Sequence, residues 1–241
     1  MNLFRLILTI PKKIIRKIYL TILREINEIF NPLSYRLKNL DKTYKKCGFN
    51  YDRHIYLKKL NKCLEELGLP IFDEKCGMYS EHLIIFSAIS HSELNPKNIL
   101  EIGTHDATTT AILSKLFPKA NIKTIDLKDD DPIFINTYNR NLNFKDFIRR
   151  RSENLEKNKN ITFIQANSLY LTFSDLLRGQ DLIWIDGAHG YPIVASDITN
   201  CLRLLNKSGI LMCDDVWKKL NRNDRIYSST ATYETISSYS F

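Results

Sequence analysis

Residues 98–110 constrain this chain most, because they are typical of a strand, a tight turn and a helix in direct succession. An apolar run with one acid inside it, residues 99–102, suits a strand that is covered on both faces. Gly103 can take a backbone conformation closed to other residues, and the threonines at 108–110 offer oxygens suited to capping the next helix. Such a turn presents backbone N–H groups and a helix N-terminus to a ligand.

A nucleotide-binding fingerprint normally carries several glycines at this point. Here only Gly103 is present, and His105 and Ala107 stand where other glycines would. By itself the stretch is equally compatible with an ordinary strand-to-helix turn in a parallel sheet. Its meaning therefore depends on the rest of the chain.

Further apolar runs alternate with helical patterns after this turn. Strands are expected at residues 122–126, 161–165, 181–186 and 210–213. Helices are expected at about 111–117, 133–157, 169–177 and 193–205, with a turn at 206–209. This alternation predicts an α/β fold, with a doubly wound, mainly parallel, Rossmann-like sheet and helices on both faces.

Three segments are expected along the chain. Residues 1–47 form a helical extension, residues 48–95 a helical lead-in with helices near 51–67 and 80–89, and residues 96–241 the core. With 44% hydrophobic residues, the chain suits one globular domain plus an appendage.

The net charge of +8 lies entirely in the extension, which has eleven Lys and Arg against three Asp and Glu. The rest of the chain is balanced, which disfavours nucleic acid as a partner. Isoleucines recur at helical spacing among basic residues over 12–30, which is typical of a basic amphipathic helix. Because the basic residues interrupt it, this segment contains no stretch of ~20 apolar residues that could span a membrane. This helix is expected to lie on an anionic membrane surface, or to pack on the protein body or on another subunit of a homo-oligomer.

The five cysteines show no close pairing, no metal-ligand spacing and an odd total. They indicate a reducing compartment. The predicted location is the cytoplasm, with a peripheral position on the inner face of the membrane if the basic helix binds lipid.

Asp126 ends the second predicted strand. In open α/β sheets, ligands bind at the carboxyl ends of the strands, and an acid there can accept hydrogen bonds from both hydroxyls of a ribose. The alternative is that Asp126 only begins a turn.

Four segments together, residues 101–106, 124–126, 181–191 and 206–216, resemble class I S-adenosylmethionine-dependent methyltransferases over roughly residues 80–217. The run Ile185-Asp186-Gly187-Ala188-His189-Gly190-Tyr191 and the run Cys213-Asp214-Asp215-Val216 are similar to a branch with metal-dependent O-methyltransferases of small molecules such as sugars and catechols.

This resemblance implies S-adenosylmethionine as the cofactor. Its methionine part would lie against Glu101 and Gly103, its ribose at Asp126 and its adenine at Asn167. Thr104 and His105 of the same turn complete the expected set.

The resemblance also implies Mg²⁺ held by Asp186, Asp214 and Asp215, since this ion prefers hard oxygen ligands. His189 would be the general base, with Asp186 beside it, and the metal would lower the pKa of an acceptor hydroxyl. The acceptor would be a small-molecule or sugar hydroxyl. Structural roles stay open as alternatives to metal binding and catalysis. One or two of the three acids would cap helices and the third would meet solvent, and His189 would be a loop histidine that hydrogen-bonds to backbone.

These methyltransferases usually end with a further helix and an antiparallel strand pair. This chain stops at Phe241, after residues 230–241 that resemble the start of a helix. The core is therefore expected to be truncated at its C-terminus, as a fragment or as a natural chain that ends short.

Two other functions stay open: a nicotinamide-dependent oxidoreductase, and a non-catalytic cofactor-binding protein attached to a membrane or partner. The single glycine of the turn and the acids after both later strands disfavour the oxidoreductase. The expected truncation favours the non-catalytic protein.

Overall fold

A computed structural model describes residues 52–73, 80–173, 177–220 and 228–239. The chain divides into two compact units, Met1–Asp52 and Arg53–Phe241, and the described helices and strands belong to the second. The predicted amphipathic helix at 12–30 lies outside the described residues. Within the described ranges, no helix is both long enough and apolar enough to cross a membrane.

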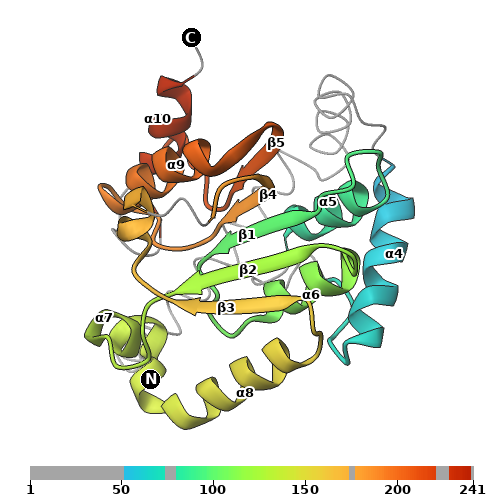
Figure 1. The fold of residues 1–241 in the computed structure, drawn as a ribbon. Coiled ribbons are helices and arrows are strands. Elements are labelled where there is room, and N and C mark those ends of the chain that lie inside the picture. The colour runs from blue at the N-terminus through green and yellow to red at the C-terminus, as the bar shows by residue number, and fades with distance from the viewer. Residues whose placement is uncertain (1–51, 74–79, 174–176, 221–227, 240–241) are drawn as a thin grey trace, which may run out of the picture. The chain divides into compact units, whose positions relative to one another are not determined.

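One parallel sheet organises the described part of the chain, with the strand order β3-β2-β1-β4-β5 (Figure 1). Its strands are β1 (Asn98–Ile102), β2 (Asn121–Asp126), β3 (Ile161–Gln165), β4 (Gln180–Ile185) and β5 (Leu205–Cys213). Ile102 pairs with Ile125 on one side and Ile185 on the other, so three strands end at one level. The predicted α/β fold is confirmed, and its strand order reverses at β1, where such sheets bind ligands.

Helices pack in two groups. In the first group, α6 (Thr108–Leu116) contacts each of the other three helices, α4 (Arg53–Glu66), α5 (Glu81–Ser90) and α8 (Phe144–Glu156). The second contains α9 (Ile193–Leu204), which packs on β4 and β5, together with η2 (Ser168–Phe173) and α10 (Ala231–Ser238). The short α7 (Pro132–Asn136) and η1 (Thr137–Leu142) lead into α8.

Side chains that alternate along β4 face the two groups of helices on opposite sides of the sheet. Ile183 and Ile185 belong to the core cluster that contains Ile198 of α9. Trp184 points the opposite way, because neighbouring residues of a strand face opposite sides of the sheet. Its ring meets Phe86 of α5 edge-on, with 5.3 Å between ring centroids.

The structure refines three local predictions. The turn expected at 206–209 lies within β5, where the pairing with β4 shifts register between Leu205 and Ile210, and a Cβ on Gly209 would lie 2.9 Å from the Gln180 carbonyl oxygen. The segment expected to be helical from 169 to 177 forms the 3₁₀ helix η2 over Ser168–Phe173, and residues 174–176 lie outside the described ranges. The helical region expected over 133–157 consists of α7, η1 and α8 in succession.

Candidate active site

The turn after β1 depends on Gly103. Its φ is +98°, and a Cβ at this position would lie 2.2 Å from the carbonyl oxygen of Asp186. Backbone hydrogen bonds fix the spacing between β1 and the strands on either side of it. The Gly103 N–H donates to Ile125 O at 2.8 Å, and the Asp186 N–H donates to Ile102 O at 2.8 Å. Only glycine fits here, because both the conformation and the space exclude a side chain.

The two residues that replace the expected glycines also have left-handed backbone, with φ of 49° at His105 and 60° at Ala107. A non-glycine residue in this region costs about 1–2 kcal/mol. Packing holds both: Ala107 is fully buried, and the His105 ring meets Tyr138 and Phe147 edge-on. The turn therefore keeps the backbone course of a glycine-rich turn without its glycines.

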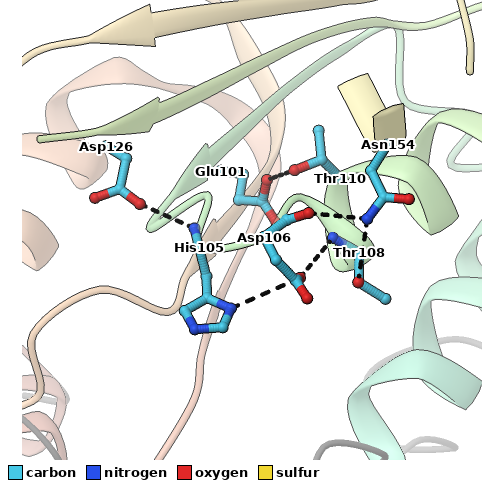
Figure 2. A network of polar contacts seen from close by, with 7 residues as sticks. All are labelled: Glu101, His105, Asp106, Thr108, Thr110, Asp126 and Asn154. Carbon is cyan, nitrogen blue, oxygen red and sulfur yellow. Dashed lines mark hydrogen bonds and ion pairs between the residues drawn. The ribbon is translucent and has the colours of Figure 1, made fainter. Parts of the chain in front are cut away.

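The start of α6 is not capped by threonine side chains, contrary to prediction. The N-cap residue is Ala107, and the Asp106 carboxylate accepts a hydrogen bond from the Thr108 N–H at 3.1 Å (Figure 2). Asn154 of α8 donates to Asp106 O at 2.9 Å, which ties the turn to a second helix. Thr110 instead turns inward to Glu101.

Glu101 lies beneath the turn, fully buried, and it does not line the cavity described below. Its Oε2 accepts hydrogen bonds from the hydroxyls of Thr110 and of Thr124, the latter at 2.6 Å. Thr124 in turn pairs with Thr104 at 2.6 Å. Oε1 has no hydrogen-bond partner among the described residues, and burial raises the pKa of Glu101 to about 7.

Glu101→Gln is expected to flatten the pH dependence of stability. Above pH 4.5 the unfolded chain loses this proton, while the folded chain keeps it to about pH 7, so the wild type loses stability as the pH rises through this window. The full difference approaches ~3 kcal/mol. Denaturant unfolding at pH 5 and pH 8 measures it, with Glu156→Gln on the surface as the control. Equal slopes for all three proteins would show that the Glu101 carboxyl does not titrate in this range.

A cavity of about 710 Å³ opens at the carboxyl edge of the sheet, within the size range of small-molecule sites. It brings together nine of the ten site residues expected from the sequence: Gly103, Thr104, His105, Asp126, Asn167, Asp186, His189, Asp214 and Asp215. Glu101 supports the floor from below.

Asp126 is held by the backbone on both carboxylate oxygens. Oδ2 accepts from the His105 N–H at 2.9 Å and Oδ1 from the Leu127 N–H at 2.8 Å. Burial raises the pKa of Asp126, and these two hydrogen bonds oppose the rise. Since a carboxylate has about four acceptor positions, two remain for ligand hydroxyls.

His189 stands among carboxyl groups in the loop after β4. It is 5% exposed, and its Nε2 lies 3.9 Å from Asp186 Oδ1 and 3.7 Å from Asp215 Oδ2. The Ser229 hydroxyl donates to the His189 carbonyl oxygen and anchors the loop. Burial raises the pKa of Asp186 well above its ordinary value, and the neighbouring Asp214 raises it further.

The three predicted metal ligands do not form a metal site as they are arranged. Among the residues that the structure describes, no group of three or more His, Cys, Asp or Glu side chains could hold a metal ion. Asp215 has a left-handed backbone, with φ of 47°, and its Oδ1 accepts from Trp217 Nε1 at 3.3 Å. Mg²⁺ therefore stays a prediction from the resemblance, and no chemical step below uses it.

Two further residues of the cavity wall were not predicted from the sequence. His82 stacks on Trp184, with ring centroids 4.6 Å apart, and burial lowers its pKa to about 4. Arg140 lies over Phe134, 4.3 Å from the ring centroid, and walls the cavity beside Asp126. His82 meets Trp184 from a distant strand, whereas Arg140 stacks on the nearby Phe134 and Tyr138.

The sheet order, the turn at Gly103 and the acid at the end of β2 agree with the fold that the resemblance to class I methyltransferases implies. Residues 100–216 match the family model described as Methyltransferase domain. Over these residues, the chain is similar to methyltransferase domains. No match to a curated protein sequence was found.

Several solved structures are similar in fold. An O-methyltransferase of tomaymycin synthesis from Streptomyces achromogenes, solved with SAM, is 14% identical, with a TM-score of 0.46 over 84% of this chain and 82% of that one. An O-methyltransferase from Bacillus cereus, solved with SAH, is 16% identical, with a TM-score of 0.45 over 83% and 86%. A precorrin-6y C5,15-methyltransferase from Geobacter metallireducens is 18% identical, with a TM-score of 0.41 over 69% and 73%.

Proposed function

We propose that this enzyme transfers the methyl group of S-adenosylmethionine to a hydroxyl oxygen of a small molecule or sugar. The observation that carries the proposal is the position of His189, a buried imidazole in the wall of the cavity that contains the Gly103 turn and Asp126. A hydroxyl is a weak nucleophile near neutral pH, so the reaction benefits from a group that removes its proton.

The chain's own residues would hold the cofactor as follows. The close approach at Gly103 leaves backbone at the cavity surface, and Asp126 offers its remaining acceptor positions to the ribose hydroxyls. Asn167, after β3, lines the same cavity and would contact the adenine. When bound, S-adenosylmethionine supplies a sulfonium methyl that passes to the acceptor oxygen as the C–S bond breaks and its electron pair stays on sulfur.

His189 would take the proton of the acceptor hydroxyl at Nε2. The imidazolium that forms would lie between the carboxyl groups of Asp186 and Asp215, at 3.9 and 3.7 Å. A negative charge at such a distance stabilises the cation, more strongly in a buried site than in water. Asp186 would thus orient the imidazole, and its carboxyl group, whose pKa burial raises, would stabilise the positive charge once it is ionised.

Metal assistance is the finer part of the proposal. Asp186, Asp214 and Asp215 are the residues that would hold Mg²⁺, and carboxylate oxygens are suitable donors for it. Their present arrangement does not fit the ion, so the proton transfer to His189 is proposed without it.

Two measurements on the full chain test this function. Calorimetric titration should show binding of S-adenosylhomocysteine and none of NAD. Methyl transfer to a panel of sugar and catechol hydroxyls should then give turnover, measured with Mg²⁺ and with a chelator. Equal turnover in chelator would remove the metal from the proposal. Binding of NAD in place of S-adenosylhomocysteine would overturn the proposal itself.

A further inference from the structure

Asp197 is a buried carboxyl group in the wall of the cavity. It lies on the apolar stripe of α9, near Val194 and Ile198, and is 1% exposed. Neither of its oxygens has a hydrogen-bond partner among the described residues. Burial raises the pKa of Asp197 and the Ser168 side chain opposes this rise, but the contact between the two side chains does not meet the geometry of a hydrogen bond.

An unpaired carboxyl in such a place destabilises the folded protein. Buried polar groups are nearly always hydrogen-bonded, and a buried charge costs still more without a partner. Burial raises the pKa of Asp197 to about 6, which reflects this cost. A ligand group that forms a hydrogen bond with Asp197 would remove this energetic cost. That group must be a hydrogen-bond donor, since a carboxylate only accepts.

The position of Asp197 indicates which part of the ligand it meets. Its Oδ2 lies near Gly187, 3.8 Å from where a Cβ there would be, and α9 packs against η2, which begins at Ser168. Ala166, Asn167 and Ser168, which follow β3, line the same cavity. With the ribose at Asp126, the base extends from β2 towards this corner.

Asn167 is the weaker acceptor for an adenine amino group. Its Oδ1 already accepts a hydrogen bond from the Leu169 N–H at 3.0 Å, at the start of η2, so only one of its two lone pairs remains. Its amide N–H₂ suits a ring nitrogen of the base. The acceptor on the other side of this corner is Asp197.

We propose that Asp197 accepts a hydrogen bond from the exocyclic 6-amino group of the cofactor's adenine, and so selects adenosine over inosine in the cofactor. This inference rests on the proposed use of S-adenosylmethionine. Inosine has a carbonyl oxygen at the 6-position. This oxygen would lie opposite the Asp197 carboxylate, and because both groups are hydrogen-bond acceptors, no hydrogen bond would form between them.

Calorimetry with two ligands tests the proposal on the full chain: S-adenosylhomocysteine and S-inosylhomocysteine. The wild type is expected to bind the adenosyl ligand at least about tenfold more tightly, as for a hydrogen bond to a charged group. Asp197→Asn should reduce this preference to about threefold or less, because an amide can donate to the inosine oxygen. Asp146→Asn, an exposed acid on α8, should keep the wild-type preference.

Thermal melting of the ligand-free proteins separates a ligand role from a structural one. Asp197→Asn should melt at or above the wild-type temperature near pH 8, because it removes an unpaired buried charge. Its rise in melting temperature with S-adenosylhomocysteine should be smaller than that of the wild type.

Three outcomes would overturn the proposal. The wild type could bind both ligands within about threefold of each other, which leaves cofactor use intact and removes the selection. Asp197→Asn could lose ligand-free stability and keep the full preference, as a structural residue would. Asn167→Ala alone could abolish the preference, which would assign it to Asn167. Failure of the wild type to bind either ligand would instead overturn the proposed function.

Discussion

Gly103→Ala is expected to destabilise the protein by about 2–6 kcal/mol and to abolish binding of S-adenosylhomocysteine. The added Cβ would lie 2.2 Å from Asp186 O and 2.8 Å from Gly187 N, both backbone atoms that cannot rotate away. Strain of the backbone at φ +98° adds about 1–3 kcal/mol, and overpacking at a rigid contact adds a similar amount or more. Relief of the contact would push β1 and β4 apart beneath the cofactor.

Gly68→Ala is the matched control. Gly68 also has a left-handed φ, +70°, but a Cβ there meets nothing within 4 Å. This variant should lose only the conformational part, about 1–2 kcal/mol, and should bind the ligand normally. Denaturant unfolding and calorimetry of both variants measure the difference. Equal losses of stability would show that the contact between the two strands relaxes freely, contrary to our argument.

His189→Ala is expected to lower kcat by about 10²–10⁴-fold while the affinity for S-adenosylhomocysteine stays within about threefold of the wild type. The imidazole would act on the acceptor hydroxyl and not on the nucleoside, so loss of the base should slow the chemical step alone. His54→Ala, an exposed histidine of α4, is the control and should leave turnover unchanged.

Two further readouts distinguish a base from a residue that only shapes the loop. Free imidazole in the assay should partly restore turnover to His189→Ala, because the truncation leaves room beside the acceptor. The pH–rate profile of the variant should lose the limb that the histidine contributes. Turnover close to that of the wild type, or a parallel loss of ligand affinity, would assign His189 to the structure of the loop.

Much of the site was predictable because the signals were local. Apolar runs that end in polar residues predict parallel strands with their acids at one edge, and nine expected site residues do line one cavity. The exceptions concern orientation. Glu101 turns below the sheet edge because neighbouring strand residues face opposite sides, and Thr110 follows it inward instead of capping α6.

Asp197 shows where a local signal was present but ambiguous. It falls on the apolar stripe of α9 with Val194, Ile198 and Cys201, where an acid is unexpected. The stripe alone cannot say whether another part of the chain pairs with the carboxyl. That depends on η2 and on the end of β4, which approach α9 from two separate stretches of sequence.

The sequence by itself determined the strand–helix alternation, the glycine turn after β1 and the edge at which the acids gather, because each follows from local spacing and residue type. Only the tertiary structure decided which polar groups are buried and which find partners. It placed His189 between two carboxyl groups, His82 against Trp184, and Asp197 in a wall where no described residue forms a hydrogen bond with its carboxyl group. Burial and pairing depend on contacts between segments far apart in the chain, and those contacts set the pKa values on which the chemistry of the site depends.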